Sequence, residues 1–173
     1  PQKNPKEAKV NYVIDMAQPY FLDSIAYLRY PHYADSLIQS TRSQSVLKSE
    51  ENFNVLKLEE ERQRLSNLFR NHGYYYYRPE FTTYRADTLQ KSGYVSLQVV
   101  PRNGIPAEAK KQYYIGNTSV YLTGYDNEPP TDTLRLRTMT FYYSGKKPGI
   151  RPNALMRNVF FRKGELFSQD RQT

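Results

Sequence analysis

Cysteine is absent from this chain of 173 residues, and histidine occurs only twice. Without cysteine there is no disulfide, no thiolate metal ligand and no thiol nucleophile, and the redox compartment cannot be read from the composition. His32 and His72 each stand beside an aromatic residue at the edge of a predicted element. Two histidines without a cysteine make a poor zinc site. We therefore expect ordinary structural or solvent-facing histidines and no metal or other cofactor.

Long apolar runs are missing as well. No run approaches the roughly 18–20 residues that cross a bilayer as a helix. Only 38% of the residues are hydrophobic, against about 45–50% in an average soluble domain. Tyrosine is the exception, with 17 residues, and its rings can build half-buried sheets with the hydroxyls at the water. We expect thin cores, as in a string of small modules. The chain opens on proline without a signal-peptide pattern, which we interpret as a piece of a longer protein.

The patterns of phosphate-binding and nucleophile loops are also lacking, since neither GxGxxG, GxSxG nor a GxxxxGK loop followed by serine or threonine occurs. Three consecutive glutamates, Glu59–Glu61, point in different directions on a helix and cannot converge on one ion. Negative charge near the start of a helix explains them better. We expect no catalytic residue, and predict that the chain is not an enzyme.

The charge is unevenly distributed. The net charge is +8, and residues 1–101 carry 13 lysines and arginines against 11 carboxylates, whereas residues 102–173 carry 12 against 6. The basic excess therefore belongs to the second half. It favours either a solvated surface or contact with anionic lipid or nucleic acid.

Residues 54–88 contain the clearest pattern, a helix that leads directly into a strand. Asn54 stands where an N-cap is expected, Glu60 and Arg64 are spaced for an ion pair across one helical turn, and Gly73 suits a left-handed helix end. Apolar residues recur at the helical period along one face: Val55, Leu58, Leu65, Leu68 and Phe69.

Four tyrosines follow Gly73 and begin a predicted strand, Tyr75–Tyr84, after which Ala86–Thr88 forms a turn and Tyr94–Val100 a second strand. In that strand one pair of tyrosines packs under the helix and the other stays at the surface. The two pairs are Tyr75 with Tyr77, and Tyr74 with Tyr76.

Upstream, residues 9–16 alternate apolar and polar side chains and are predicted to form a strand. Tyr20–Tyr30 is a second predicted strand. Pro31 then begins a short helix that ends near Thr41. The order from Tyr20 onward is therefore β-α-α-β-β. Two alternating sets are visible in the second strand: Phe21, Ile25, Tyr27 and Arg29, and Leu22, Ser24, Ala26 and Leu28.

The second half begins with a Pro/Gly/Lys-rich linker, residues 101–111. Tyr113–Val120 is predicted to be an opening strand and Leu134–Tyr143 its partner in a long hairpin. Asn153 then introduces a helix. Its apolar residues are Leu155, Met156, Val159 and Phe160.

The helix–turn–strand pattern resembles POTRA domains, the periplasmic modules of BamA/TamA-type outer-membrane assembly proteins of the surface antigen family, most closely the TamA-like members of Bacteroidetes-type bacteria. The joint at residues 18–22 and the segment 161–168 (FRKGELFS) resemble the family's module joints, although Ala17 and Gln18 stand where glycine is frequent. The matching residues are Leu58, Glu61, Arg62, Arg64, Leu65, Phe69, Arg70, Asn71, Gly73, Tyr74, Tyr75, Ala86, Asp87 and Thr88.

The resemblance implies an α+β fold of tandem modules, each with a small mixed three-stranded sheet covered by two helices. Residues 1–17 would hold the last strand of a preceding module, 18–101 a complete module, 102–111 a linker, and 112–173 the first part of the next module. The incomplete module is then expected to be weakly stable or to pack against another copy.

The resemblance further implies a periplasmic, non-catalytic module that binds unfolded β-rich outer-membrane proteins or assembly-complex subunits by strand addition, and a C-terminal membrane barrel in the full-length protein. The basic second half would lie nearer the membrane, where it can contact anionic lipid. The binding residues would be an edge strand, with Tyr75, Tyr76, Tyr77, Phe81, Thr82, Thr83 and Tyr84. The facing groove on the long helix would be Arg62, Leu65 and Phe69.

An alternative from a different class is a nucleic-acid-binding module that uses the basic charge and the tyrosine faces. The tyrosine run keeps only the glycine and aromatics of an RNA-recognition motif, and the β-α-α-β-β order differs from that fold. No nucleic-acid partner is therefore expected. The two hypotheses differ in the salt dependence of binding, which is steep for nucleic acid and mild for strand pairing.

Overall fold

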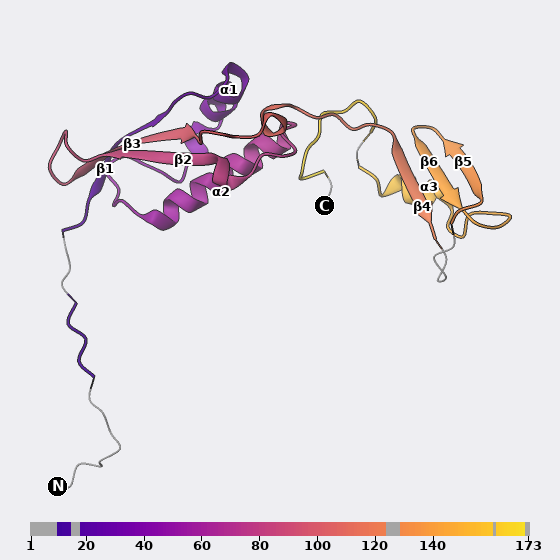
Figure 1. The fold of residues 1–173 in the computed structure, drawn as a ribbon, viewed down its shortest axis with the longest axis horizontal. Helices are drawn as coiled ribbons and strands as arrows, with labels where there is room; N and C mark the ends of the chain where they lie inside the picture. The colour runs from indigo at the N-terminus through magenta and orange to yellow at the C-terminus, as the bar shows by residue number, and fades with distance from the viewer. Residues whose placement is uncertain (1–9, 15–17, 124–128, 161, 172–173) are drawn as a thin grey trace, which may run out of the picture.

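The computed structural model describes residues 10–14, 18–123, 129–160 and 162–171. They form an α+β structure with two three-stranded mixed sheets and three α-helices (Figure 1). The first sheet and its two helices consist of β1 (Phe21–Tyr27), α1 (His32–Ser40), α2 (Val55–Asn71), β2 (Thr82–Asp87) and β3 (Tyr94–Pro101). The second sheet and its helix consist of β4 (Thr118–Leu122), β5 (Asp132–Leu136), β6 (Met139–Tyr143) and α3 (Pro152–Arg157).

The first sheet has the order β1-β3-β2, with β1 parallel and β2 antiparallel to β3. The predicted β-α-α-β-β order is confirmed, and so is the strand beginning at Tyr94. Both helices contribute to the core, which Ile38 of α1 and Leu65 of α2 share with Leu97 and Val99 of β3. On the opposite face of β3, Gln98 is exposed, whereas Val100 is buried.

A β-bulge reconciles the two alternating sets of β1. The register with β3 shifts between Leu22 and Ser24, so that Asp23 is an extra residue. Leu22 pairs with Val95 and Tyr27 with Val99, and all four side chains are buried. Without the extra residue, strict alternation would place Leu22 and Tyr27 on opposite faces. The bulge therefore lets one strand supply core residues from both sets.

Helix α2 begins and ends as predicted. The Asn54 side-chain oxygen accepts a hydrogen bond from the Leu56 amide at 2.8 Å, which satisfies one of the free N–H groups of the first turn. At the other end Gly73 has φ +94°, a left-handed conformation that costs other residues about 1–2 kcal/mol. The amide of Tyr74 returns to the carbonyl of Phe69 at 3.1 Å.

The ionic contacts of α2 differ from the prediction, because Arg64 pairs with Glu61 and not with Glu60. The Glu61 side chain is completely buried, so helix-start electrostatics does not explain this residue. Its carboxylate accepts hydrogen bonds from the Tyr27 hydroxyl at 2.5 Å and the Val46 amide at 3.2 Å, besides two from Arg64 at 2.6 and 2.9 Å.

The strand predicted for residues 9–16 is not formed where the structure describes it. Residues 10–14 have no strand partner, and Val10, Tyr12, Val13 and Ile14 are each at least 66% exposed. Residues 9, 15 and 16 lie outside the described residues. An alternating segment forms a strand only when a neighbour satisfies its backbone, and none does so in the described part of the chain.

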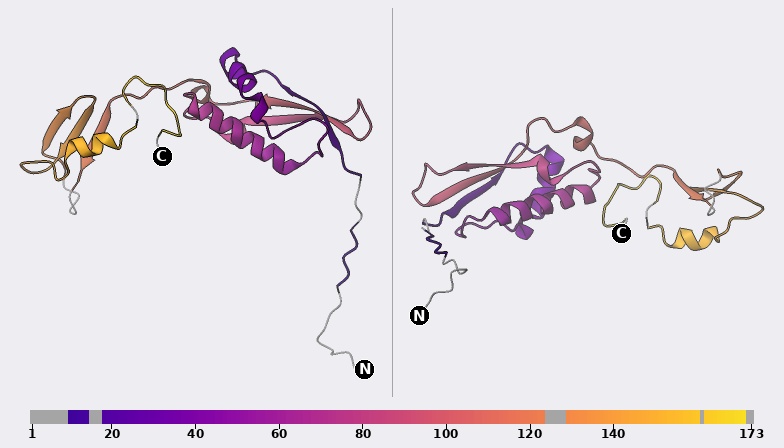
Figure 2. Two further views of the ribbon diagram at one scale, coloured as in Figure 1. Left: turned by 180° about the vertical axis from the view of Figure 1, so that it is seen from behind. Right: turned by 60° about the horizontal axis from the view of Figure 1, so that its bottom comes forward.

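The second half differs more. The segment 134–143 is two strands and not one, because Arg137 adopts φ +52° and β5 turns back onto β6 at Arg137 and Thr138. The opening strand β4 starts at Thr118 and pairs with β6 in parallel, so the predicted long hairpin is wrong. The helix ends at Arg157, before Val159 and Phe160. It lies alongside the second sheet (Figure 2).

The segment predicted to be a linker, residues 101–111, has local structure of its own. It contains a short 3₁₀ helix, η3 (Ala107–Lys110), and buries Ile105 and Ala109. In the part of the chain that the structure describes, no helix combines the length and apolarity needed to cross a membrane.

Replacing Glu61 by glutamine is expected to lower the free energy of unfolding by about 3 kcal/mol, because the Arg64 guanidinium then loses its counterion in a largely buried place. The control is Glu60→Gln, which changes an exposed glutamate of the same helix and should stay within about 0.5 kcal/mol of wild type. Urea unfolding followed by circular dichroism measures both. Equal effects of the two substitutions would show that the buried network contributes nothing specific.

Stability should also fall in alkaline solution. Burial raises the pKa of Tyr77 from 10.0 to about 12. Burial and the hydrogen bond to Glu61 do the same for Tyr27, and burial also raises the pKa values of Tyr30 and Tyr84. Because these hydroxyls ionise more readily in the unfolded chain, their contribution is complete below about pH 10 and lost above it, by up to about 1.4 kcal/mol per pH unit for each tyrosine.

Unfolding by guanidinium chloride, repeated at several pH values from about 9 to about 11, measures this decline in stability. In Tyr77→Phe the free energy of unfolding should fall less steeply with pH, by about the contribution of one tyrosine, because residue 77 no longer ionises. A wild type whose stability is constant over this range contradicts the expected linkage.

Candidate functional site

The predicted edge strand is displaced toward the C-terminus. Tyr75, Tyr76 and Tyr77 belong to a turn, and residues 79–81 form a short 3₁₀ helix, η2 (Pro79–Phe81). The strand itself, β2, begins at Thr82 and includes Ala86 and Asp87, which were predicted to lie in the turn. Among the seven residues predicted for the edge, Thr82, Thr83 and Tyr84 lie in it.

The outer edge of β2 is open. The Phe81 carbonyl accepts a bond from the Arg102 amide at 2.7 Å, so by antiparallel alternation Thr83, Arg85 and Asp87 direct their backbone groups to β3. Tyr84 and Ala86 direct theirs outward. Within the described residues, the backbone N–H and C=O of these two have no hydrogen-bond partner outside the sheet.

The opposite edge of the sheet is covered along its first part. Residues 50–53 lie against the start of β1, where Leu22 donates to the Glu51 carbonyl at 2.8 Å and accepts from the Glu50 amide at 2.7 Å. Further along, the Arg42 guanidinium donates to the Ile25 carbonyl at 2.6 Å. The first sheet therefore offers the outer edge of β2 to an incoming strand, whereas the β1 edge is covered along its first part.

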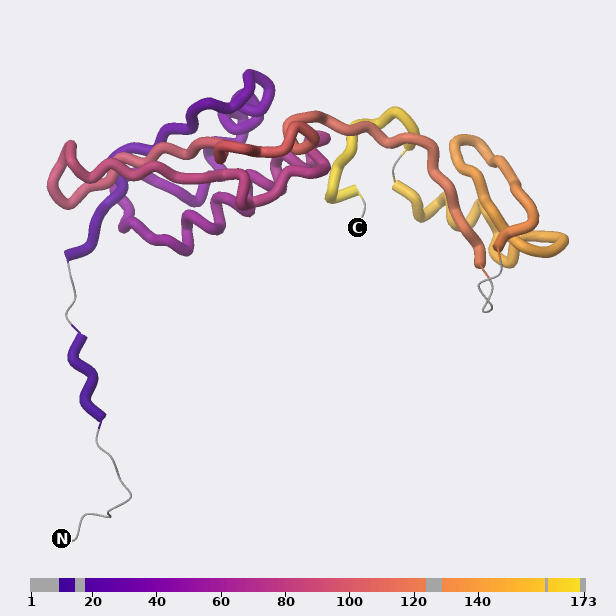
Figure 3. The backbone as a smooth tube through the Cα atoms, in the orientation of Figure 1, coloured from indigo at the N-terminus to yellow at the C-terminus, as the bar shows by residue number. Residues whose placement is uncertain are grey.

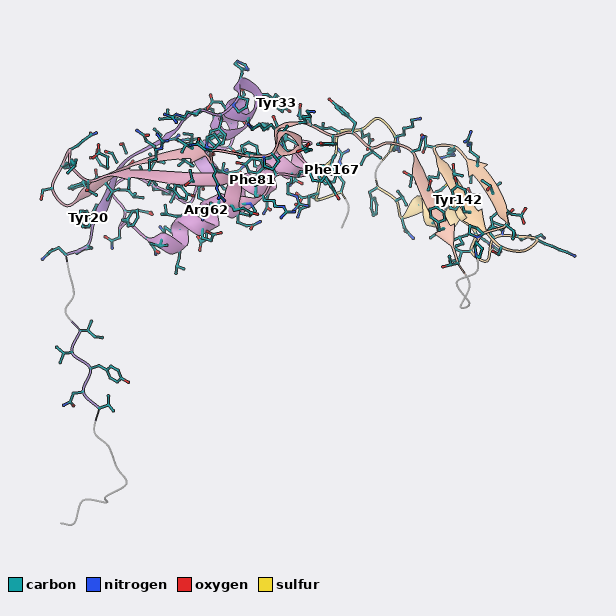
Figure 4. The ribbon with its side chains drawn as sticks, in the orientation of Figure 1. Tyr20, Tyr33, Arg62, Phe81, Tyr142 and Phe167 are labelled. Atoms are coloured by element: carbon teal, nitrogen blue, oxygen red, sulfur yellow. The ribbon has the colours of Figure 1, made fainter. Side chains whose placement is uncertain are left out.

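The predicted groove on α2 is filled. Leu65 and Phe69 are at most 1% exposed and form part of the core beneath the sheet, so they do not face a groove beside β2. Arg62 does lie beside β2, with its guanidinium 5.3 Å from the centre of the Tyr84 ring. The Tyr84 hydroxyl donates to the Leu58 carbonyl at 2.6 Å and closes the space between the strand and the helix. Arg62 and Phe81 can be seen on adjoining elements in Figure 4.

The tyrosine run divides differently from the prediction. Tyr74 and Tyr77 are buried against Phe69, with ring centres 5.7 and 4.6 Å from it. Tyr75 and Tyr76 turn outward. This spacing of three residues fits a turn, whereas a strand would alternate the side chains.

The outward tyrosines contact residues far along the chain. The Tyr75 ring lies edge-on to Phe167 at 4.8 Å, and the Tyr76 ring edge-on to Tyr113 at 5.2 Å. Phe167 is visible near the end of α2 that faces the second sheet (Figure 4). Because their rings are engaged in this cluster, Tyr75 and Tyr76 do not form a free stacking platform.

The end of α2 holds the segment 165–170 through one side chain. The Asn71 amide group donates to the Asp170 carboxylate at 2.6 Å, while its oxygen accepts from the Asp170 amide at 3.0 Å and the Ser168 hydroxyl at 3.4 Å. Figure 3 shows this C-terminal segment, in yellow, turning back to the first part of the chain.

A second chain segment is held at the same helix end. Gln112 donates through its side chain to the His72 carbonyl at 2.9 Å, and the Tyr113 amide donates to the Gly73 carbonyl at 2.8 Å. A side chain at Gly73 would bring its Cβ within 2.6 Å of Leu166. A larger residue here would therefore have to displace the Leu166 side chain as well as adopt a left-handed dihedral angle.

Residues 71–76, 112–114 and 165–170 together form what we call the junction. It joins two segments whose sequence patterns are distinctive, Asn71–Tyr75 and residues 165–168, which stand almost one hundred residues apart. Each segment is recognisable in the sequence, but neither contains a local signal that it contacts the other. The described residues include no cluster of side chains that could hold a metal ion.

No protein-family model matches the chain, and a search of curated proteins likewise finds no match. The fold and the contacts described above are therefore the basis for any functional assignment.

The junction predicts that two glycines with similar backbone conformations respond differently to alanine. Gly93 has φ +76° and open space around it, whereas Gly73 has φ +94° and meets Leu166. We expect Gly93→Ala to cost about 1 kcal/mol from backbone strain alone, and Gly73→Ala about twice that.

Urea unfolding measures both costs, and hydrogen exchange of the Tyr113 amide localises the effect. Exchange should accelerate in Gly73→Ala, because the bond from this amide to Gly73 is strained, and stay unchanged in Gly93→Ala. Equal costs and equal exchange in the two variants would mean that the junction is not a stabilising contact.

Proposed function

We propose that this chain is a non-catalytic, polypeptide-binding and scaffolding part of a periplasmic outer-membrane assembly factor, made of POTRA modules of the BamA/TamA type. Its clients are unfolded β-rich outer-membrane proteins or partner subunits. The observation that carries the proposal is the open outer edge of β2, in a sheet whose β1 edge is covered along its first part by residues 50–53. An extended client strand would add to β2 through backbone hydrogen bonds, which are largely independent of the client's sequence.

The architecture supports the same proposal. The POTRA resemblance implies a β-α-α-β-β order with a small mixed three-stranded sheet, and the first part of the chain has this order and a sheet of this kind. The junction supports the scaffolding part, because Asn71 and Gly73 hold the following segment by hydrogen bonds and by close packing. A connection of this kind fixes neighbouring modules more firmly than a flexible linker would.

A nucleic-acid-binding function is the second candidate, and one observation favours it. Tyr121 and Tyr142 stack on the second sheet, with ring centres 4.7 Å apart and an angle of 9° between their planes, and Tyr121 is 62% exposed. This face lies in the more basic half of the chain. Aromatic rings on an exposed sheet can stack bases, and such binding would weaken steeply with salt.

The test of strand addition is Ala86→Pro. The Ala86 amide points away from β3, so proline removes a donor from the free edge and leaves the ladder to β3 intact. We expect about tenfold weaker binding of an unfolded outer-membrane β-strand peptide, since one backbone hydrogen bond is lost and the proline ring obstructs the approaching strand. Fluorescence anisotropy at low and moderate salt measures the affinity.

Ala86→Val serves as the matched control, because it keeps the backbone donor and suits a strand; its affinity should stay near that of wild type. Single-stranded RNA is titrated in parallel. Peptide binding that is unaffected by the proline would refute addition at β2. RNA binding that collapses with salt, without any peptide binding, would decide for the second candidate.

A further inference from the structure

A cavity of about 350 Å³ lies at the carboxyl ends of the two parallel strands, β1 and β3. Its walls come from three separated parts of the chain: residues 29–34 at the start of α1, residues 69–77 at the end of α2, and residues 101–110, which include η3. Its volume falls at the lower end of the range for small-molecule sites, roughly 300–1,000 Å³.

The interior of the cavity is apolar and aromatic. Four rings line it, those of Tyr30, Phe69, Tyr74 and Tyr77, and Ile105 and Ala109 complete the wall. Phe69 and Ala109 are each 1% exposed, so the wall is built from well-packed core residues. Such a wall takes up an apolar group by the hydrophobic effect and by ring contacts.

The rim carries charge of one sign. Arg29, Arg102 and Lys110 line the cavity, and neither an aspartate nor a glutamate does so. All three cations are exposed, and none forms an ion pair with a described residue. An anionic group at the rim would therefore meet three cations without displacing a carboxylate from any of them.

One further feature favours an anionic ligand. Helix α1 begins at this cavity, with Pro31 as its N-cap and no side chain accepting from the first N–H groups; these groups and the helix dipole attract negative charge.

We propose that this cavity binds a small amphipathic carboxylate, with its apolar body between the aromatic rings and its carboxylate at the rim formed by Arg29, Arg102 and Lys110. The site is separate from the β2 edge and does not depend on strand addition there. Its ligand is a molecule the size of a medium-chain fatty acid or an arylalkanoic acid, given the cavity volume.

The test is an NMR titration of the whole chain with octanoate, 1-octanol and octyltrimethylammonium, which share a chain length and differ in charge. Octanoate should shift the amide signals of Ala34, Ile105 and Ala109, and should bind at least about fivefold more tightly than octanol. The cationic probe should leave these signals unchanged, because three like charges repel it.

The double substitution Arg102→Gln with Lys110→Gln should weaken octanoate binding about tenfold and change octanol binding less than about twofold. Lys146→Gln with Lys147→Gln is the matched control, since it removes the same charge from exposed positions outside the cavity. In the control, octanoate binding should match that of wild type.

Three results would overturn the proposal. Octanol binding as tightly as octanoate would mean that the cavity does not recognise the carboxylate. Equal weakening by the control pair would indicate attraction to the overall charge. Titration without shifts at Ala34, Ile105 and Ala109 would place any binding elsewhere. Because Ala86→Pro leaves this cavity intact, octanoate binding in that variant is measured independently of the peptide result.

Discussion

The buried carboxylate of Glu61 is the constraint on which the first part of the structure depends. It draws together the end of β1 through Tyr27, the connection between the helices through Val46, and α2 itself through Arg64. A buried charge is tolerated only when it is paired and hydrogen-bonded on all sides. The orientation of α2 over the sheet is therefore restricted to one in which all of these donors reach the same carboxylate.

Helix α2 in turn positions several other parts of the molecule. Leu65 and Phe69 enter the core on the face next to Glu61, and the last turn carries Asn71 to the junction. Phe69 also belongs to the wall of the cavity at the start of α1. The end of α2 thus has three roles, in the core, in the junction and in the cavity, and a shift of this helix would change all of them together.

Sequence patterns were sufficient for the features that depend on local chemistry. The N-cap at Asn54, the left-handed Gly73 and the β-α-α-β-β order all follow from residue type and period, and all are present. The run from Tyr75 to Phe81 was misassigned because aromatic residues favour strands, while the packing of Tyr74 and Tyr77 on Phe69 demands a turn. Tertiary packing outweighed local propensity there.

Other features left no local signal. The turn at Arg137 occurs without a glycine, so nothing marked the division of β5 from β6. The helical period places Glu61, and not Glu60, on the face of Leu58 and Leu65, but no local pattern shows that Tyr27 and Val46 donate hydrogen bonds to its carboxylate. The junction and the cavity are both made of segments that are distant along the chain, and periodicity within a window cannot detect them.

The unequal edges of the first sheet also limit how this protein can assemble with itself. A sheet that is open on both sides can extend indefinitely, copy upon copy, which is the geometry of a fibre. Here residues 50–53 cover the start of β1, so the edge that is free along its whole length is that of β2, and two molecules that meet along it pair β2 to β2. That contact has two-fold symmetry. Because each molecule covers the free β2 edge of the other, no β2 edge is left for a third molecule. The covering segment therefore makes association through this sheet self-limiting.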